Sequence, residues 1–179
     1  METLPDYLQQ GLRIIFVGIN PGLYSAQRGH YFSTTRNRFW MAFNAAEMTP
    51  VPLEPDTDSE CLRYGIGLTD VVKRPTRSMS ELRPYEFSEG AVVLQEKLLQ
   101  YQPLFACFNG ISGYKNYLRR VNPGQREVRL GLQALTIGDT RVYVLPSTSP
   151  ANAAVPLERI VLGMRELKRL VAETKAGDS

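Results

Sequence analysis

Cysteine and histidine are scarce in this 179-residue chain, which contains two cysteines and one histidine. Cys61 and Cys107 are isolated and form no CxxC pair, so we expect no structural metal, iron–sulfur cluster or other cofactor. Cys107 lies within an apolar run and is expected to be a small buried hydrophobe rather than half of a disulfide. This use of cysteine is typical of a reducing compartment.

Long apolar runs are also missing. The first ten residues contain two acids and neither a basic segment nor an apolar core, which argues against a signal peptide. No apolar run approaches the roughly 18 residues that a membrane helix needs. We therefore expect a cytoplasmic monomer with no membrane partner. The phosphate-binding patterns GxxxxGK[ST] and GxGxxG are absent as well, which disfavours a phosphate-loop protein.

The apolar patterns present alternate between strand and helix. We expect buried strands at 14–17 and 104–108, helices at 85–101, 111–120 and 156–171, and a hairpin or two sequential strands between 133 and 145. This order predicts an α/β fold, namely a three-layer α/β/α domain with a mostly parallel central sheet. The length fits one domain over 1–179, with an N-terminal arm at 1–11 and a C-terminal tail at 172–179.

Two segments are expected to lie outside the regular elements. Residues 23–36 lack periodicity and are expected to form a structured loop over the end of the first strand. Residues 47–60 carry five acids and three prolines, which indicates an exposed excursion facing away from any nucleic acid.

The first strand ends at a sharp turn, GINPG at 18–22. Ligands of open α/β sheets bind at the carboxyl ends of strands, so Asn20 is a candidate for chemistry. Its alternative role is to tolerate an unusual backbone angle in the turn.

Four motifs occur in a fixed order along the chain. They are GINPG with RGHYF and NRFW at 18–40, YGIGLTD at 64–70, FNG at 108–110 and LPSTS at 145–149. In order and spacing they resemble the mismatch-specific uracil-DNA and thymine-DNA glycosylases, over residues 12 to 171. The resemblance implies the uracil-DNA glycosylase fold.

The resemblance also assigns roles to residues of the first motif. The asparagine of GINPG positions a water molecule in that family, which implies a catalytic role for Asn20. The flipped base stacks on an aromatic residue that falls on Phe32, and backbone groups of Ile19 and Phe32 read its edge. Gly18 and Ser25 belong to the same implied base pocket. Ordinary core packing is the alternative for Phe32, although its polar neighbours favour a pocket wall.

Asp70 occupies a position at which members of that family vary. A carboxylate there can assist the water or stabilise the sugar cation, which makes Asp70 a second catalytic candidate. The alternatives are a helix cap or a partner for Arg74.

The last motif departs from the family pattern. The family inserts a bulky residue into the gap left by the flipped base, whereas Ala151 is small and has no side-chain donor. The resemblance implies a DNA-binding loop, made of Ser147, Thr148, Ser149, Pro150, Ala151 and Asn152. None of the motifs contains lysine, so no Schiff-base lyase step is expected.

Positive charge gathers after the second motif. The formal net charge is only +3 and the sequence pI about 8.9, but Lys73, Arg74 and Arg77 cluster and are a candidate phosphate surface. Local pairing of these charges, for example between Asp70 and Arg74, is the alternative.

Together these features predict a monofunctional DNA glycosylase that hydrolyses uracil from DNA and initiates base excision repair. The expected partner is double-stranded DNA with uracil mismatches. Thymine in T:G pairs, other damaged bases and single-stranded DNA stay open as substrates. The alternative is a non-catalytic or degenerate DNA- or nucleotide-binding α/β module.

Overall fold

A computed structural model describes the backbone of residues 2–177 and the side chains of residues 2–174. Along the chain the strands and α-helices are β1 (Ile14–Gly18), α1 (Leu23–Arg28), α2 (Phe39–Ala45), β2 (Ile66–Asp70), α3 (Pro84–Tyr101), β3 (Phe105–Asn109), α4 (Ile111–Val121), β4 (Gly131–Ile137), β5 (Thr140–Leu145) and α5 (Leu157–Gly177). Short 3-10 helices lie at Pro55–Tyr64, Met79–Glu81 and Pro150–Asn152.

The strands form one five-stranded sheet in the order β2-β1-β3-β5-β4. Neighbouring strands are parallel from β2 to β5, and only β4 runs antiparallel, paired with β5. The parallel strands therefore present their carboxyl ends at one edge of the sheet, which is where a ligand is expected. The expected α/β fold with a mostly parallel sheet is confirmed.

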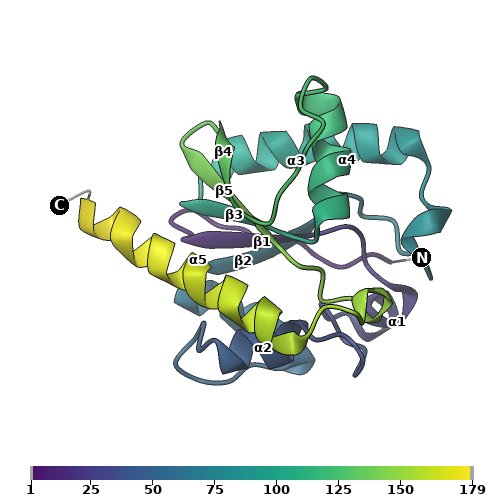
Figure 1. Ribbon diagram of the computed structural model, residues 1–179. Coiled ribbons are helices and arrows are strands. Elements are labelled where there is room, and N and C mark those ends of the chain that lie inside the picture. Colours follow the sequence, from purple (N-terminus) through teal and green to yellow (C-terminus); the bar gives the residue numbers. More distant parts are fainter. Residues whose placement is uncertain (1, 178–179) are drawn as a thin grey trace.

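Helices cover both faces of the sheet (Figure 1). Ile14 and Phe16 of β1 pack with α2 and α5, whereas Ile15 and Val17 pack with α3 and α4. This alternation follows from the strand period of two and gives the three expected layers. No helix within residues 2–177 is both long and apolar enough to cross a membrane.

The structure decides one open alternative about local structure and adjusts two expectations. The segment 133–145 is a hairpin of β4 and β5, one of the two alternatives left open. The expected loop at 23–36 contains a short helix, α1. Helix α5 continues to Gly177 through most of the expected tail at 172–179, and residues 178–179 lie outside the described part of the chain.

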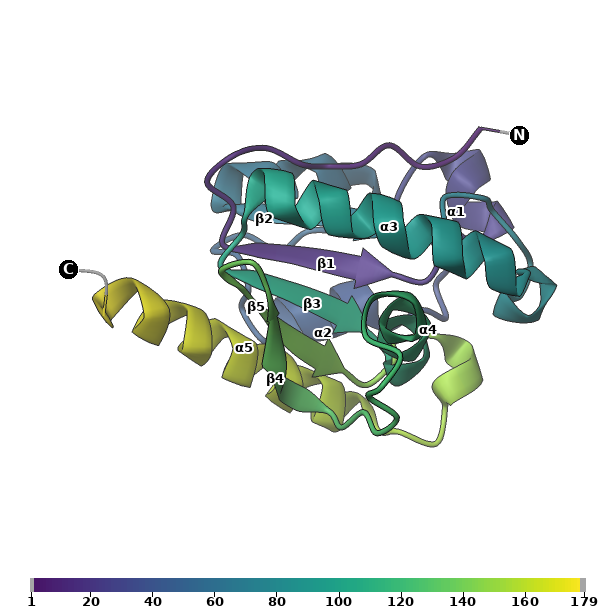
Figure 2. The same ribbon diagram turned by 90° about the horizontal axis from the view of Figure 1, so that it is seen from above.

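The N-terminal arm, residues 2–11, runs along the outer edge of the sheet before it turns back into β1 (Figure 2). Tyr7 exchanges two backbone hydrogen bonds with Leu68 of β2, at 2.9 and 3.1 Å. Gly67 permits this approach, because a Cβ there would lie 2.5 Å from the carbonyl oxygen of Tyr7. The arm is therefore fixed against the edge strand.

Candidate active site

A cavity of about 830 Å³ opens at the carboxyl ends of the parallel strands. Most of the site residues expected from the sequence line it together, although they come from distant parts of the chain. These residues are Gly18, Ile19, Asn20, Ser25, Phe32, Asp70, Arg77, Ser147, Ser149, Pro150, Ala151 and Asn152. Lys73, Arg74 and Thr148 do not line the cavity.

The amide of Asn20 is held in one orientation. Its Nδ2 donates to the carbonyl oxygen of Arg74 and to Oγ1 of Thr76, both at 2.8 Å, and to the carbonyl oxygen of Pro21 at 3.2 Å. Within residues 2–177 its Oδ1 has no protein partner, and the residue lines the cavity. Asn20 thus presents a fixed hydrogen-bond acceptor to whatever occupies the cavity.

Asp70 is the last residue of β2 and is 4 % exposed. Its carboxylate reaches across to β1, where a Cβ at Gly18 would lie 2.6 Å from Oδ1. Glycine at position 18 therefore makes room for this carboxylate at the strand ends. Burial raises the pKa of Asp70 to about 6, while the positive charge of Lys73 opposes that rise.

The alternative that Asp70 pairs with Arg74 is wrong. Oδ2 of Asp70 lies 3.2 Å from Nζ of Lys73. Arg74 instead binds Glu86, with Nε 2.6 Å from Oε1, and this contact lowers the pKa of Glu86 to about 2. Lys73 and Arg74 of the candidate phosphate surface are thus each paired with a carboxylate. Arg77 lines the cavity, is exposed, and has no ion-pair partner within residues 2–174.

Phe32 forms an aromatic wall of the cavity. Its ring stacks on Phe39 with centroids 4.1 Å apart and planes at 20°. Its φ of 52° is unusual for a bulky residue, and such strained backbone gathers at functional sites. Within residues 2–177 its backbone N–H and that of Ile19 have no protein acceptor. Both N–H groups are available to a ligand.

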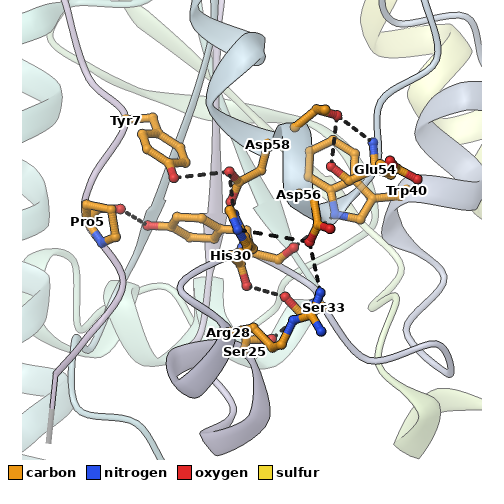
Figure 3. Close-up of polar contacts among 12 residues, drawn as sticks. Pro5, Tyr7, Ser25, Arg28, His30, Ser33, Trp40, Glu54, Asp56 and Asp58 are labelled. Atoms are coloured by element: carbon orange, nitrogen blue, oxygen red, sulfur yellow. Dashed lines mark hydrogen bonds and ion pairs between the residues drawn. The ribbon is translucent and has the colours of Figure 1, made fainter.

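The turn that contains Phe32 is fixed by polar contacts with the acidic segment at 47–60 (Figure 3). Asp58 is fully buried, and its carboxylate accepts from the N–H of Tyr31 at 2.8 Å and from the hydroxyl of Tyr7 at 3.1 Å. Nδ1 of His30 also lies 3.1 Å from this carboxylate. The expectation that the segment is an exposed excursion is therefore wrong at Asp58, because Tyr31 of the cavity wall, His30 and Tyr7 surround that side chain.

The opposite wall comes from the loop after β5. Thr148 is fully buried, where its Oγ1 accepts from Nδ2 of Asn109 and its N–H donates to Oδ1 of the same amide. Both ends of the Asn109 amide are thus occupied within the protein. Thr148 lies beneath the expected DNA-binding loop rather than on its surface, whereas Ala151 is exposed in the 3-10 helix Pro150–Asn152.

Sequence reasoning missed the residues that support the site. Thr76 and Asp58 lie outside the four motifs. Thr76 acts through a hydrogen bond to Asn20, 56 residues away, and Asp58 through one to Tyr31, 27 residues away. Asn109 belongs to the third motif, FNG, but no structural or catalytic role could be assigned to it from the sequence. Within the described side chains, no three His, Cys, Asp or Glu residues are grouped so as to hold a metal ion.

The geometry agrees with two comparisons with known proteins. A family model described as the uracil DNA glycosylase superfamily matches residues 5–162. A solution NMR structure from Methanosarcina acetivorans, described as a proposed uracil DNA glycosylase, aligns with a TM-score of 0.58 at 23% identity, covering 93% of this chain and 98% of that one. At this identity the likeness concerns the fold. Because the family model spans most of the sequence, the chain belongs to the uracil DNA glycosylase superfamily.

Proposed function

We propose that the protein is a monofunctional DNA glycosylase that hydrolyses the N-glycosidic bond of uracil in DNA and so initiates base excision repair. The observation that carries the proposal is the fixed amide of Asn20. All of its donor capacity is used by the protein, whereas Oδ1 accepts no hydrogen bond from the described residues, and Asn20 lines the cavity. An acceptor held in this way can orient a water molecule for attack, although an amide cannot take up its proton.

The substrate fits the shape and chemistry of the cavity. A glycosylase must take the base out of the stack before cleavage. One face of Phe32 packs on Phe39, which leaves the other for a flipped planar base. The N–H groups of Ile19 and Phe32 are suited to the carbonyl oxygens of uracil, on which negative charge builds as the base leaves.

The reaction balances with the groups present. The C1′–N1 bond breaks with its electron pair going to uracil, and the oxygen of the water oriented by Asn20 bonds to C1′. The water loses one proton, and the uracil anion later takes one from solvent. Asp70, ionised above pH 6, stabilises the cationic sugar and accepts the proton.

The absence of lysine from the cavity supports a hydrolytic reaction without a lyase step. No lysine occurs among the described residues that line the cavity, and Lys73 points its ammonium at Asp6 and Asp70 instead. A lyase step requires an amine that forms a Schiff base with C1′. We therefore expect intact abasic sites as the product.

The preferred substrate should be a base that leaves the duplex easily. Ala151 is small and provides a poor wedge, so U:G mismatches and uracil in single strands should react faster than U:A pairs. A preference for mismatches would thus follow because Ala151 is too small to fill the gap left by the flipped base.

A cleavage panel tests the function. Oligonucleotides with U:G, U:A, T:G and single-stranded uracil are incubated with the protein, and half of each sample is treated with alkali. Strand breaks only after alkali, on at least one uracil substrate, are expected. Breaks without alkali would contradict the monofunctional assignment. DNA binding without any breaks would support the alternative of a degenerate binding module.

A further inference from the structure

Four charged side chains of alternating sign extend from Asp70 toward α3. Nζ of Lys73 lies 3.2 Å from Oδ2 of Asp70 and 2.8 Å from Oδ1 of Asp6. Oδ2 of Asp6 lies 2.6 Å from Nζ of Lys97 on α3. The hydroxyl of Thr69 donates to Oδ1 of Asp6 at 2.8 Å. The side chains of Lys73, Asp6 and Lys97 are each less than 30 % exposed, so solvent screens these contacts only in part.

Asp6 enters this network from the N-terminal arm. Besides the backbone pairing of Tyr7 with Leu68, the hydroxyl of Thr3 donates to the carbonyl oxygen of Lys73. Leu4 is buried and lines the base cavity. The arm is therefore fixed on both sides of Asp6 and contributes directly to the wall of the site.

Asp70 lies in the wall between the base cavity and a second cavity of about 220 Å³ beside α3. One oxygen approaches Gly18, and the other contacts Lys73. The charged and titratable groups around Asp70 come from four elements: Lys73 after β2, Asp6 on the arm, Lys97, Glu86 and Glu89 on α3, and Tyr31 in the loop after α1. Lys73 alone among them contacts the Asp70 carboxylate.

We propose that Lys73 is a positioning residue that holds the Asp70 carboxylate ionised and aligned, and that Asp6 holds Lys73 there. The N-terminal arm is then a working part of the active site. The inference rests on the proposed function insofar as Asp70 acts in excision. Burial of Asp70 favours its neutral form, the ammonium of Lys73 opposes this, and Asp6 acts on Asp70 as a like charge.

Two substitutions should move the pH dependence in opposite directions. Lys73→Gln removes the counter-ion, so the acid limb of the single-turnover rate should move up by about one pH unit, which is about a tenfold loss on that limb. KM should change little, because Lys73 lies outside the cavity. Asp6→Asn keeps an acceptor for Lys73 but removes the like charge, so the acid limb should move down. Lys73→Arg should restore most of the rate.

Lys168→Met on α5 is the matched control, since its ammonium donates to the carbonyl oxygen of Glu47, away from Asp70, and the pH profile of this variant should be unchanged. Thermal unfolding verifies that each variant is folded. If Lys73→Gln does not fold, the pH dependence of the rate is measured in Lys73→Arg and Asp6→Asn instead. Identical acid limbs in the wild type, Lys73→Gln and Asp6→Asn would overturn the proposal. So would full activity of Asp70→Asn.

A direct titration separates this inference from the proposed function. The carboxyl carbon of Asp70 is followed by carbon-13 NMR against pH in the wild type and in Lys73→Gln, with no DNA present. A higher carboxyl pKa in the variant supports the network even if no base is excised. An unchanged carboxyl pKa overturns it even if excision is robust.

Discussion

The two walls of the cavity use their polar atoms differently. At the ends of β1 and β2, the Asn20 amide is anchored through its nitrogen, and one oxygen of Asp70 is bound by Lys73 while the other packs at Gly18. On the other wall, the hydroxyls of Ser147 and Ser149 accept from backbone N–H groups of their own loop. That loop, residues 147–152, includes the small and exposed Ala151.

This difference separates two tasks. The first wall holds side chains in fixed orientations, and for the proposed reaction such preorganisation matters most for catalysis. On the second wall we propose that the small, exposed Ala151 stands where a wedge would reach the DNA stack. Substitutions on the first wall should therefore change the rate of bond cleavage, and those on the second should change the choice of DNA.

The largest effect is expected for Asn20→Ala. Loss of the oriented acceptor should lower single-turnover excision of uracil by about 100-fold or more, because misplacing a reactant by about 1 Å can cost that much. Binding to DNA that contains an abasic site should stay within about threefold, as measured by fluorescence anisotropy. Asn116→Ala on the surface of α4 is the matched control and should keep full activity. Equal losses of rate and binding would point to a misfolded variant.

Asp70→Asn should have the next largest effect. Excision at pH 7.5 should fall by about 10- to 100-fold, and the acid limb near pH 6 should disappear, because the group that titrates there is gone. An Asn20-dependent rate that is as fast as in the wild type would show that Asp70 is structural.

Asp70→Asn should also change stability, and in the opposite direction: activity falls, but the free energy of unfolding rises. The folded-state pKa of Asp70 lies above the ordinary value of 3.8, so its proton binds more tightly in the folded state, and its ionisation costs stability at neutral pH. That cost is lost as the pH falls through 6 toward 4. Asp70→Asn should therefore raise the free energy of unfolding at pH 7.5 by up to about 3 kcal/mol, as measured by urea denaturation. A large destabilisation would show that Lys73 and Asp6 depend on the charge of Asp70.

Strands β1 and β3, helices α3, α4 and α5 and the strand-end turn could be predicted from sequence because each follows from a local pattern, whereas β2 and α1 were not predicted. Five apolar residues before GINPG identified β1, and helical spacing identified α3 and α5. The position of Asn20 at the cavity followed from the same turn. These features depend on neighbours in the chain, so one sequence suffices to find them.

The partners of the site residues could not be predicted in the same way. Asp70 pairs with Lys73 rather than Arg74, and Lys73 also contacts Asp6, which lies 67 residues earlier. The acidic, proline-rich composition around Asp58 predicts an exposed excursion, but the chain buries Asp58 together with Met48, Thr49 and Leu53. Charge pairing across the fold is set by backbone placement, which periodicity does not report.

Arg77 and Arg74, which follow β2 near the first wall, should differ in how much each contributes to DNA binding. Arg77 is exposed and unpaired within the described side chains, whereas Arg74 is bound to Glu86. Affinity for DNA should fall with salt, and Arg77→Ala should reduce the log–log slope by about 0.9, the value for one phosphate contact. Arg74→Ala should reduce it less, since Glu86 already neutralises its charge. Arg169→Ala on α5 serves as the control, and an equal or larger effect of Arg74→Ala would contradict the assignment.

The smallest effect, and the one most specific to the second wall, is expected at Ala151. Its side chain is exposed in the short 3-10 helix at the cavity rim, where a longer residue can extend toward DNA without displacing the core. Ala151→Leu and Ala151→Arg should raise the rate on U:A and U:G duplexes by about two- to tenfold, because filling the gap left by the base is worth about 1 kcal/mol of unstacking. The rate on single-stranded uracil should not change, since no stack has to be opened. Single-turnover rates on matched oligonucleotides give the ratio of duplex to single-strand excision. If neither substitution changes that ratio, the loop at 150–152 does not enter the stack, and the second wall acts only on the DNA backbone.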